Sequence, residues 1–272
     1  MEHQTTEEQW RTILTGDNRA VLAMRRRFER LPSPPRCKLC YAPFHGIGGL
    51  LLKPWFGPWE RNRQLCKNCM RVLTKHGVGG AEVEISMLFV DIRGSTGLGE
   101  RLGPAAFAAL LTAFYRLAAG AIVDTDGIVD KFVGDEAIGL YIPSYAGRDH
   151  ARQAIDGGRR IIEATSRSDA STSGPIPVGG GVHTGIAFVG TLGSSEEISD
   201  FTALGDSMNT TARLASLAGP GELLVSVAAA EHASFDATGL DRRTVEVRGR
   251  EATLDVYALG KVQGERTGET RG

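Results

Sequence analysis

The sequence lacks the features that would direct it to a membrane or to an oxidising compartment. Its first residues are polar, without the apolar core of a signal peptide. The most apolar stretch, residues 104–123, is interrupted by Tyr115 and Arg116, which favours a helix of the protein core over a membrane span. All four cysteines fall between residues 37 and 69, so a disulfide framework is not expected. We therefore expect a cytoplasmic protein without a membrane segment.

Internal repeats are also absent, and a formal net charge of -1 leaves little overall charge of either sign. The charges are nevertheless unevenly distributed. Residues 1–80 contain 14 Lys and Arg against 6 Asp and Glu, whereas the rest of the chain contains 17 against 26. A basic first part on an acidic body indicates two units that attract each other, a basic face for an anionic partner, or simply a solvated basic helix. No groove-reading helix is evident, so nucleic acid is not an expected partner.

The chain divides into four parts by composition. Residues 1–35 have helical spacing with a break at 16–18, and residues 36–80 form a small module rich in Cys, Gly and Pro that ends in a hinge. Residues 81–260 alternate strands with helices and include a hairpin, and the polar tail 261–272 is expected to be disordered. This pattern predicts an α+β fold in which helices cover a sheet, preceded by a small helical module.

The cysteines form two CxxC pairs, Cys37 with Cys40 and Cys66 with Cys69. Two such pairs separated by 25 residues are a strong signal for a four-thiolate metal site. Zinc is the first choice because it requires only tetrahedral thiolate ligands. An iron–sulfur cluster is the alternative, and it would make the module a redox or oxygen sensor.

Two aspartates follow predicted strands in the larger part. Asp91 ends an apolar strand and opens a turn of small residues, Gly94, Ser95 and Thr96, while Asp135 lies at the predicted hairpin turn. Carboxylates in such positions can hold Mg²⁺ or Mn²⁺, and the N–H groups of the turn can face phosphate oxygens. Two ions held together would clamp both oxygens of an in-line displacement at phosphorus.

Four sequence motifs follow one another along the chain: FVDIRGST, KFVGDEAIGLY, GVHTG and FTALGDSMNTTARLAS. Together they make residues 82–260 resemble the catalytic domain of class III adenylyl and guanylyl cyclases. The resemblance implies that domain's fold, a ferredoxin-like sheet covered by helices. It also implies that Asp91 and Asp135 hold two Mg²⁺ or Mn²⁺ ions, with the backbone carbonyl of Ile92 completing one shell.

The resemblance implies that Lys131 and Thr202 bind the purine base of the substrate. Many members have Asp in place of Thr202, and threonine there is similar to a bacterial variant of the family. Lysine can donate to N1 of adenine and threonine can accept from its 6-amino group, so this pair suits ATP. Guanylyl cyclases typically carry Glu and Cys or similar residues at the two positions, which this chain lacks.

Asn209 and Arg213 are four residues apart and so share one helix face. By resemblance, Asn209 orients the ribose, Arg213 stabilises charge on the α-phosphate, and Arg248 contacts the triphosphate. The 3′-hydroxyl attacks the α-phosphorus, pyrophosphate leaves, and a 3′,5′-cyclic nucleotide results. In the family, the aspartates of one subunit face the purine and Asn/Arg residues of the other, which implies a head-to-tail homodimer with two sites.

The sequence therefore predicts an adenylyl cyclase that is regulated by an N-terminal metal-binding module. A guanylyl or low-specificity purine cyclase is one alternative, because only Lys131 and Thr202 separate the two. An inactive nucleotide-sensing scaffold is another, although the chain keeps every residue that degenerate cyclases usually lose. A diguanylate cyclase is disfavoured because its GGDEF signature is absent, the local residues being VGDEA at 133–137.

Overall fold

The computed structural model describes residues 6–31, 35–60, 62–74, 79–168, 174–195, 198–246 and 253–260. Three predictions lie at least partly outside these residues. They are the triphosphate contact of Arg248, most of the hinge before residue 80, and the disordered tail 261–272.

The N-terminal region forms four helices, α1 (Thr6–Thr15), α2 (Arg19–Glu29), α3 (Gly46–Phe56) and α4 (Lys67–Thr74). The predicted break between the first two is confirmed, because the Asn18 side chain accepts hydrogen bonds from the backbone N–H groups of Ala20 and Val21 and so begins α2. Helix α3 was not expected, since its sequence contains several glycines and Pro54.

The rest of the chain builds one mixed sheet. Its strands are β1 (Gly80–Ile92), β2 (Ile128–Val133), β3 (Glu136–Tyr141), β4 (Val178–Ser195), β5 (Ile198–Leu204), β6 (Leu223–Ser226), β7 (Asp241–Glu246) and β8 (Thr253–Leu259). The order is β2-β3-β1-β4-β6-β8-β7, with β5 paired to the far end of β4. Only the β4–β6 pair is parallel. The predicted α+β fold is confirmed, and β5 is a strand that the sequence did not predict.

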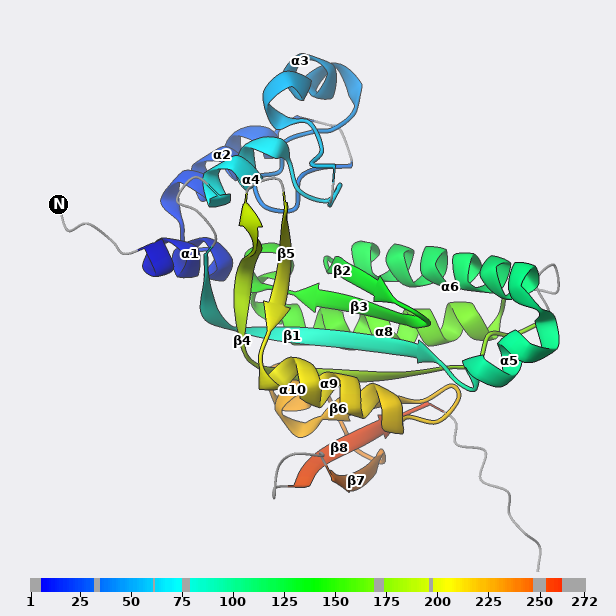
Figure 1. Ribbon diagram of the computed structural model, residues 1–272. Coiled ribbons are helices and arrows are strands. Elements are labelled where there is room, and N and C mark those ends of the chain that lie inside the picture. Colours follow the sequence, from blue (N-terminus) through cyan, green and yellow to red (C-terminus); the bar gives the residue numbers. More distant parts are fainter. Residues whose placement is uncertain are drawn as a thin grey trace, which may run out of the picture.

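In the described residues, the helical segments that accompany the sheet are α5 (Ser95–Leu102), α6 (Pro104–Asp124), α7 (Pro143–Ala146), η1 (Gly147–Asp149), α8 (His150–Ser166), α9 (Asp206–Leu217) and α10 (Val227–His232). Helices α6 and α8 run side by side over one face, and the β4–β5 hairpin rises towards the N-terminal helices (Figure 1). Among the described residues, α6 is long and apolar enough to cross a membrane by length and composition, and 22% of its most apolar window is buried.

Strand β1 separates two hydrophobic cores. Leu88 and Val90 point into the core that α6 and α8 cover. Ile85 and Met87 point the other way, into a core that they share with Trp10 of α1 and with the buried cysteines. This second core contains residues of both the N-terminal region and β1. The N-terminal helices are therefore packed onto the sheet that carries the predicted site.

Helix α3 presents several apolar side chains to solvent. Ile47 is 81% exposed, and Leu50, Leu51 and Trp55 are also largely exposed. Trp10, in contrast, is only 3% exposed. The N-terminal region therefore combines a well-buried centre with an apolar outer helix.

Candidate active site and cysteine cluster

Asp91 and Asp135 lie together at one end of the sheet. Asp91 is opposite Glu136 in the β1–β3 pairing, and Asp135 occupies the turn between β2 and β3. The backbone N–H of Ile92 donates to the carbonyl oxygen of Asp135 at 3.2 Å, which fixes the turn against the end of β1. The two predicted metal ligands are therefore brought together, and Arg93 forms an ion pair with Asp91 beside them.

The carboxylates at this end of the sheet repel one another. Burial, a hydrogen bond with Asp135 and the charge of Asp135 raise the pKa of Asp91 to about 6, against the attraction of Arg93. Burial and the charges of the two aspartates likewise raise the pKa of Glu136 to about 7. One oxygen of Asp91, Oδ1, is buried and has no hydrogen-bond partner among the residues that the structure describes. An unpartnered buried carboxylate oxygen in an acidic group is what a divalent cation would satisfy, so these residues fit Mg²⁺ or Mn²⁺.

A cavity of 250 Å³ opens beside Asp135. Its lining includes Ser95 and Thr96 of the first turn of α5, together with Gly134 and Asp135. Gly94 begins α5 with a left-handed φ of 66°, which glycine adopts without strain. The turn predicted to face phosphate oxygens thus opens a helix next to the aspartates.

Lys131 and Thr202 are also in contact, although 71 residues separate them. The Nζ of Lys131 donates to Oγ1 of Thr202 at 3.0 Å, and this hydroxyl in turn donates to Oδ2 of Asp130 at 3.0 Å. The Asp130 side chain is 1% exposed, and burial raises its pKa above the usual value. The two residues predicted to bind the purine therefore form a hydrogen-bonded triad with the buried carboxylate of Asp130.

Asp130 is a site residue that the sequence reasoning missed. The β2–β3 register shifts between Val129 and Lys131, so Asp130 has no partner on β3. An extra residue in one strand re-aims the side chains around it, which allows both Asp130 and Lys131 to reach Thr202. A charged residue directly before the motif lysine, inside the apolar run IVDKFV, was the available signal.

Helix α9 carries Asn209 and Arg213 one turn apart, and it begins two residues after β5, the strand of Thr202. It approaches the sheet closely, because a Cβ on Gly181 would meet the backbone nitrogen of Ala215 at 2.5 Å. Asn209 is exposed, and the Nε of Arg213 is buried without a hydrogen-bond partner in the described part of the chain. The helix thus offers an amide and a guanidinium group whose Nε is left unsatisfied.

The predicted residues fall into separate groups. Among the residues that the structure describes, no hydrogen bond or ion pair joins the aspartate pair to Lys131 and Thr202, or to Asn209 and Arg213. Asp135 and Lys131 share one hairpin, but Lys131 lies within β2 and Asp135 lies in the turn that follows this strand.

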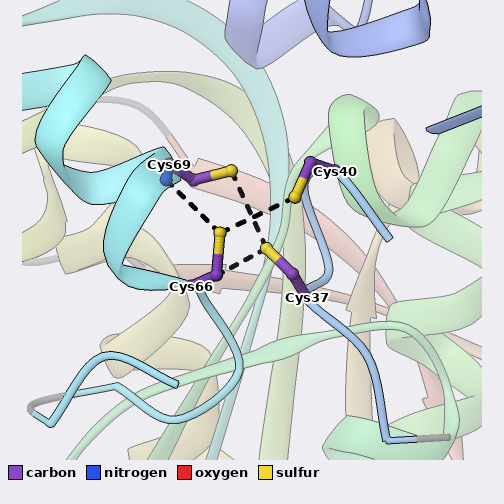
Figure 2. Close-up of side chains that lie close together, drawn as sticks. All are labelled: Cys37, Cys40, Cys66 and Cys69. Atoms are coloured by element: carbon purple, nitrogen blue, oxygen red, sulfur yellow. Dashed lines mark hydrogen bonds between the residues drawn. The ribbon is translucent and has the colours of Figure 1, made fainter. Parts of the chain in front are cut away.

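The four cysteines converge in the N-terminal region (Figure 2). All are buried, and none forms a disulfide. The Sγ atoms of Cys37 and Cys69 are 3.9 Å apart, and those of Cys40 and Cys66 are 3.6 Å apart. A zinc ion with Zn–S bonds of about 2.3 Å places tetrahedral sulfurs about 3.8 Å from one another. The cluster therefore fits a single tetrahedral ion.

Backbone and thiol hydrogen bonds favour a thiolate within the cluster. The N–H of Cys66 donates to Sγ of Cys37, and the N–H of Cys69 donates to Sγ of Cys66, both at 3.3 Å. Burial raises the pKa of Cys37, but hydrogen bonds from the other three cysteines outweigh it and lower this pKa well below its usual value. A thiolate is the form that binds metal.

The loop between the cysteine pairs touches the edge strand β2. The side chain of Gln64 donates to the carbonyl of Gly127 at 3.0 Å and accepts from the N–H of Val129 at 2.9 Å. Lys38, between the first two cysteines, donates to Asp126 at 2.7 Å. The cysteine region is therefore bonded to the chain segment that runs directly into Asp130 and Lys131.

A comparison with known families identifies the larger part of the chain. The model of the adenylate and guanylate cyclase catalytic domain matches residues 80–261. The chain belongs to this family. All the predicted active-site residues lie inside the matched range, whereas the four cysteines lie before it.

Curated relatives include Adenylate cyclase 1 of Rhizobium meliloti (strain 1021), 28% identical over 68% of this chain, and an adenylate cyclase of Anabaena cylindrica, 27% identical over 69%. The chain spans only 29% and 40% of the lengths of these two relatives. Among solved structures, the guanylyl cyclase Cya2 is 26% identical, with a TM-score of 0.62, and covers 69% of this chain and 98% of its own. Relatives of both nucleotide specificities are thus represented.

Proposed function

We propose that this protein is an adenylyl cyclase, which converts ATP to 3′,5′-cyclic AMP and pyrophosphate. The observation that carries the proposal is the triad of Lys131, Thr202 and Asp130. An ionised carboxylate can only accept hydrogen bonds, so Asp130 directs the Thr202 proton towards itself. The hydroxyl then offers a lone pair outward, which suits the 6-amino group of adenine and not the 6-oxo group of guanine.

Lys131 supports the same choice of base. Its side chain is 43% exposed, and its contacts with Thr202 and Asp130 use two of the three N–H donors of the ammonium group, so the third can donate to N1 of adenine. N1 of guanine carries a hydrogen and would face this donor unfavourably. The curated relatives named as adenylate cyclases agree, whereas the guanylyl cyclase Cya2 supports the second candidate, a guanylyl or low-specificity cyclase.

The reaction follows from the grouping of residues. Asp91, Asp135 and the Ile92 carbonyl would hold two Mg²⁺ or Mn²⁺ ions, which when bound neutralise charge on the attacking and leaving oxygens. The first turn of α5, with Gly94, Ser95 and Thr96, would bind phosphate oxygens. Asn209 would orient the ribose, and Arg213 would stabilise the charge that develops on the α-phosphate.

A head-to-tail homodimer would complete each site. Among the described residues, no hydrogen bond or ion pair joins the aspartate pair to the purine and Asn/Arg residues, which agrees with a site shared between two subunits. In a two-fold symmetric dimer every contact between a residue of one subunit and a residue of the other occurs twice, so two identical sites would form.

The four cysteines would hold one zinc ion in a module that regulates the catalytic part. All four ligand sulfurs lie within 4.8 Å of one another, which suits one ion better than a cluster, whose irons and sulfides would hold the cysteines further apart. The bonds from Gln64 and Lys38 to the segment before Lys131 offer the route by which the module acts. We assign residues 1–35 and 36–80 to this N-terminal part and 81–260 to the catalytic domain.

Product analysis tests the proposal directly. The full-length chain would be incubated with Mn²⁺ and equal concentrations of ATP and GTP, and cyclic products would be quantified by mass spectrometry. We expect cyclic AMP to predominate. Predominant cyclic GMP would overturn the purine assignment while leaving the fold and the reaction class intact. Absence of both products, with Mn²⁺ and with Mg²⁺, would favour a nucleotide-sensing scaffold.

A further inference from the structure

A third group of potential ligands lies at the opposite end of β1 from Asp91. Glu84 on β1, His150 at the start of α8 and His232 at the end of α10 each offer one ligand atom, and these atoms all lie within 4.8 Å of one another. Seven residues of extended strand separate Glu84 from Asp91, or about 23 Å. The group is therefore distinct from both the carboxylate pair and the cysteine cluster.

The three side chains converge from different elements. Nε2 of His232 lies 3.4 Å from Oε1 of Glu84, and the rings of His150 and His232 have centroids 4.2 Å apart with planes inclined by 48°. Two neutral imidazoles at this distance stabilise each other only weakly, whereas a cation coordinated by both rings would hold them together.

The orientation of His150 is fixed from behind. Its Nδ1 bonds to Oγ of Ser86 at 2.8 Å, and Ser86 bonds to Oγ1 of Thr184 at 2.6 Å. All three residues are buried. A hydrogen bond on one ring nitrogen that leaves the other facing its neighbours is the usual support of a metal-binding histidine.

The ring of His150 is also in the form that a ligand requires. Burial and then the neighbouring His232 lower the pKa of His150 to about 4, although Asp149 opposes the shift. A neutral imidazole has a lone pair available at neutral pH, whereas an imidazolium does not.

We propose that Glu84, His150 and His232 bind a divalent transition-metal ion of the zinc class, with water as the remaining ligand. Two imidazoles and one carboxylate form a donor set that zinc uses with an open fourth position. Glu84 is 53% exposed and His232 is 27% exposed, so an ion and its water can enter from solvent. Bound there, the ion ties β1 to α8 and α10.

Zinc stoichiometry in the full-length chain tests this site. Asp91→Asn serves as the parent protein, because it removes the carboxylate pair as a competing site. After equilibrium dialysis against Zn²⁺, metal analysis should find one more zinc per chain in the parent than in the parent with His232→Ala or Glu84→Gln. Glu82→Gln, an exposed carboxylate two residues away on β1, should leave the count unchanged, as should His45→Ala.

Thermal unfolding supplies an independent measurement. Zinc at about a hundredfold excess over its Kd should raise the Tm of the parent by about 5 °C. The rise should be smaller in the His232→Ala and Glu84→Gln proteins, which keep only the cysteine cluster as a zinc site, while their Tm without zinc shows that they are folded. Equal zinc counts in the parent and in both cluster variants, or an equal rise in Tm, would overturn the proposal.

Discussion

The cysteine cluster and the carboxylate pair are built on opposite principles. The cysteines are buried, close together and complete within one chain. Asp91 and Asp135 form an acidic, partly exposed group whose proposed partners Asn209 and Arg213 lie on a separate helix, α9. The cysteine cluster can be satisfied by an ion alone, whereas in the proposed mechanism the carboxylate pair needs ions, a nucleotide and a second subunit.

Because of this difference, we expect substitutions in the cysteine cluster to lower the stability of the fold and substitutions in the carboxylate pair to lower the activity. Removing a ligand from a complete, buried cluster leaves unpaired groups in the core, so the folded state is weakened. Removing a ligand from an incomplete, half-exposed group relieves repulsion between like charges, so the fold is preserved while the chemistry is lost. The predictions below test this contrast, beginning with the largest effect.

Asp91→Ala and Arg213→Ala should each reduce turnover by roughly a hundred- to a thousandfold, because each removes electrostatic stabilisation of the transition state. Mixing the two proteins should restore activity, since a heterodimer contains one site with both residues. Cyclic nucleotide formation by the single and mixed proteins is the measurement. Asp124→Ala, an exposed aspartate at the end of α6, is the control. A mixture no more active than its components would contradict the shared site.

Cys66→Ser should lower the metal content and the Tm together, because three thiolates hold an ion less well and the buried centre of the N-terminal region loses its support. Metal analysis and thermal unfolding measure the two effects. Lys67→Ala changes the next, exposed residue and should alter neither. If the Cys66→Ser protein kept its metal and its Tm, the cysteine cluster would not be what stabilises the N-terminal region.

Asp130→Asn should shift the preference between ATP and GTP. An amide can donate to Thr202, which frees the threonine proton to point towards the 6-oxo group of guanine. Reversing one hydrogen bond of about 1 kcal/mol on each substrate changes the ratio of kcat/KM values by about tenfold or more. Competition assays with both nucleotides provide the ratio. An unchanged ratio, with total activity retained, would argue against a role for Asp130 in choosing the base.

Gln64→Ala should have the smallest effect, a fall in kcat/KM of about threefold. It removes two side-chain bonds to the segment before Lys131, each worth about 1 kcal/mol or less in stability, and only part of this loss reaches the purine site. Steady-state kinetics compared with Arg63→Ala, the exposed neighbour, isolates the contact. Identical kinetics for the two variants would remove Gln64 as a route between the two regions.

The sequence predicted those features that a family motif or a local spacing carries. The pairing of Asp91 with Asp135 and of Lys131 with Thr202 followed from a family motif, and the convergence of the cysteines followed from CxxC spacing. Helix α3 was missed because its glycines and Pro54 are helix-breaking in isolation, and it forms between the two cysteine pairs.

Other features depend on tertiary contacts that no local pattern contains. The role of Asp130 arises from a register shift between two strands, and that of Gln64 arises from contact with an edge strand more than 60 residues away. The convergence of Glu84, His150 and His232 requires the topology of the whole domain.

The distribution of aromatic residues has a practical consequence for experiments in solution. All three tryptophans, Trp10, Trp55 and Trp59, lie in the first 60 residues, and the family-matched range contains none. Trp10 is enclosed in the shared core, whereas Trp55 is 58% exposed. Intrinsic tryptophan fluorescence therefore originates entirely in the N-terminal region, with Trp10 reporting on the core that this region shares with β1, and quenchers in solution will separate the emission of buried Trp10 from that of exposed Trp55. Any change in that emission when nucleotide is added would be a direct optical readout of communication between the N-terminal region and the family-matched residues 80–261.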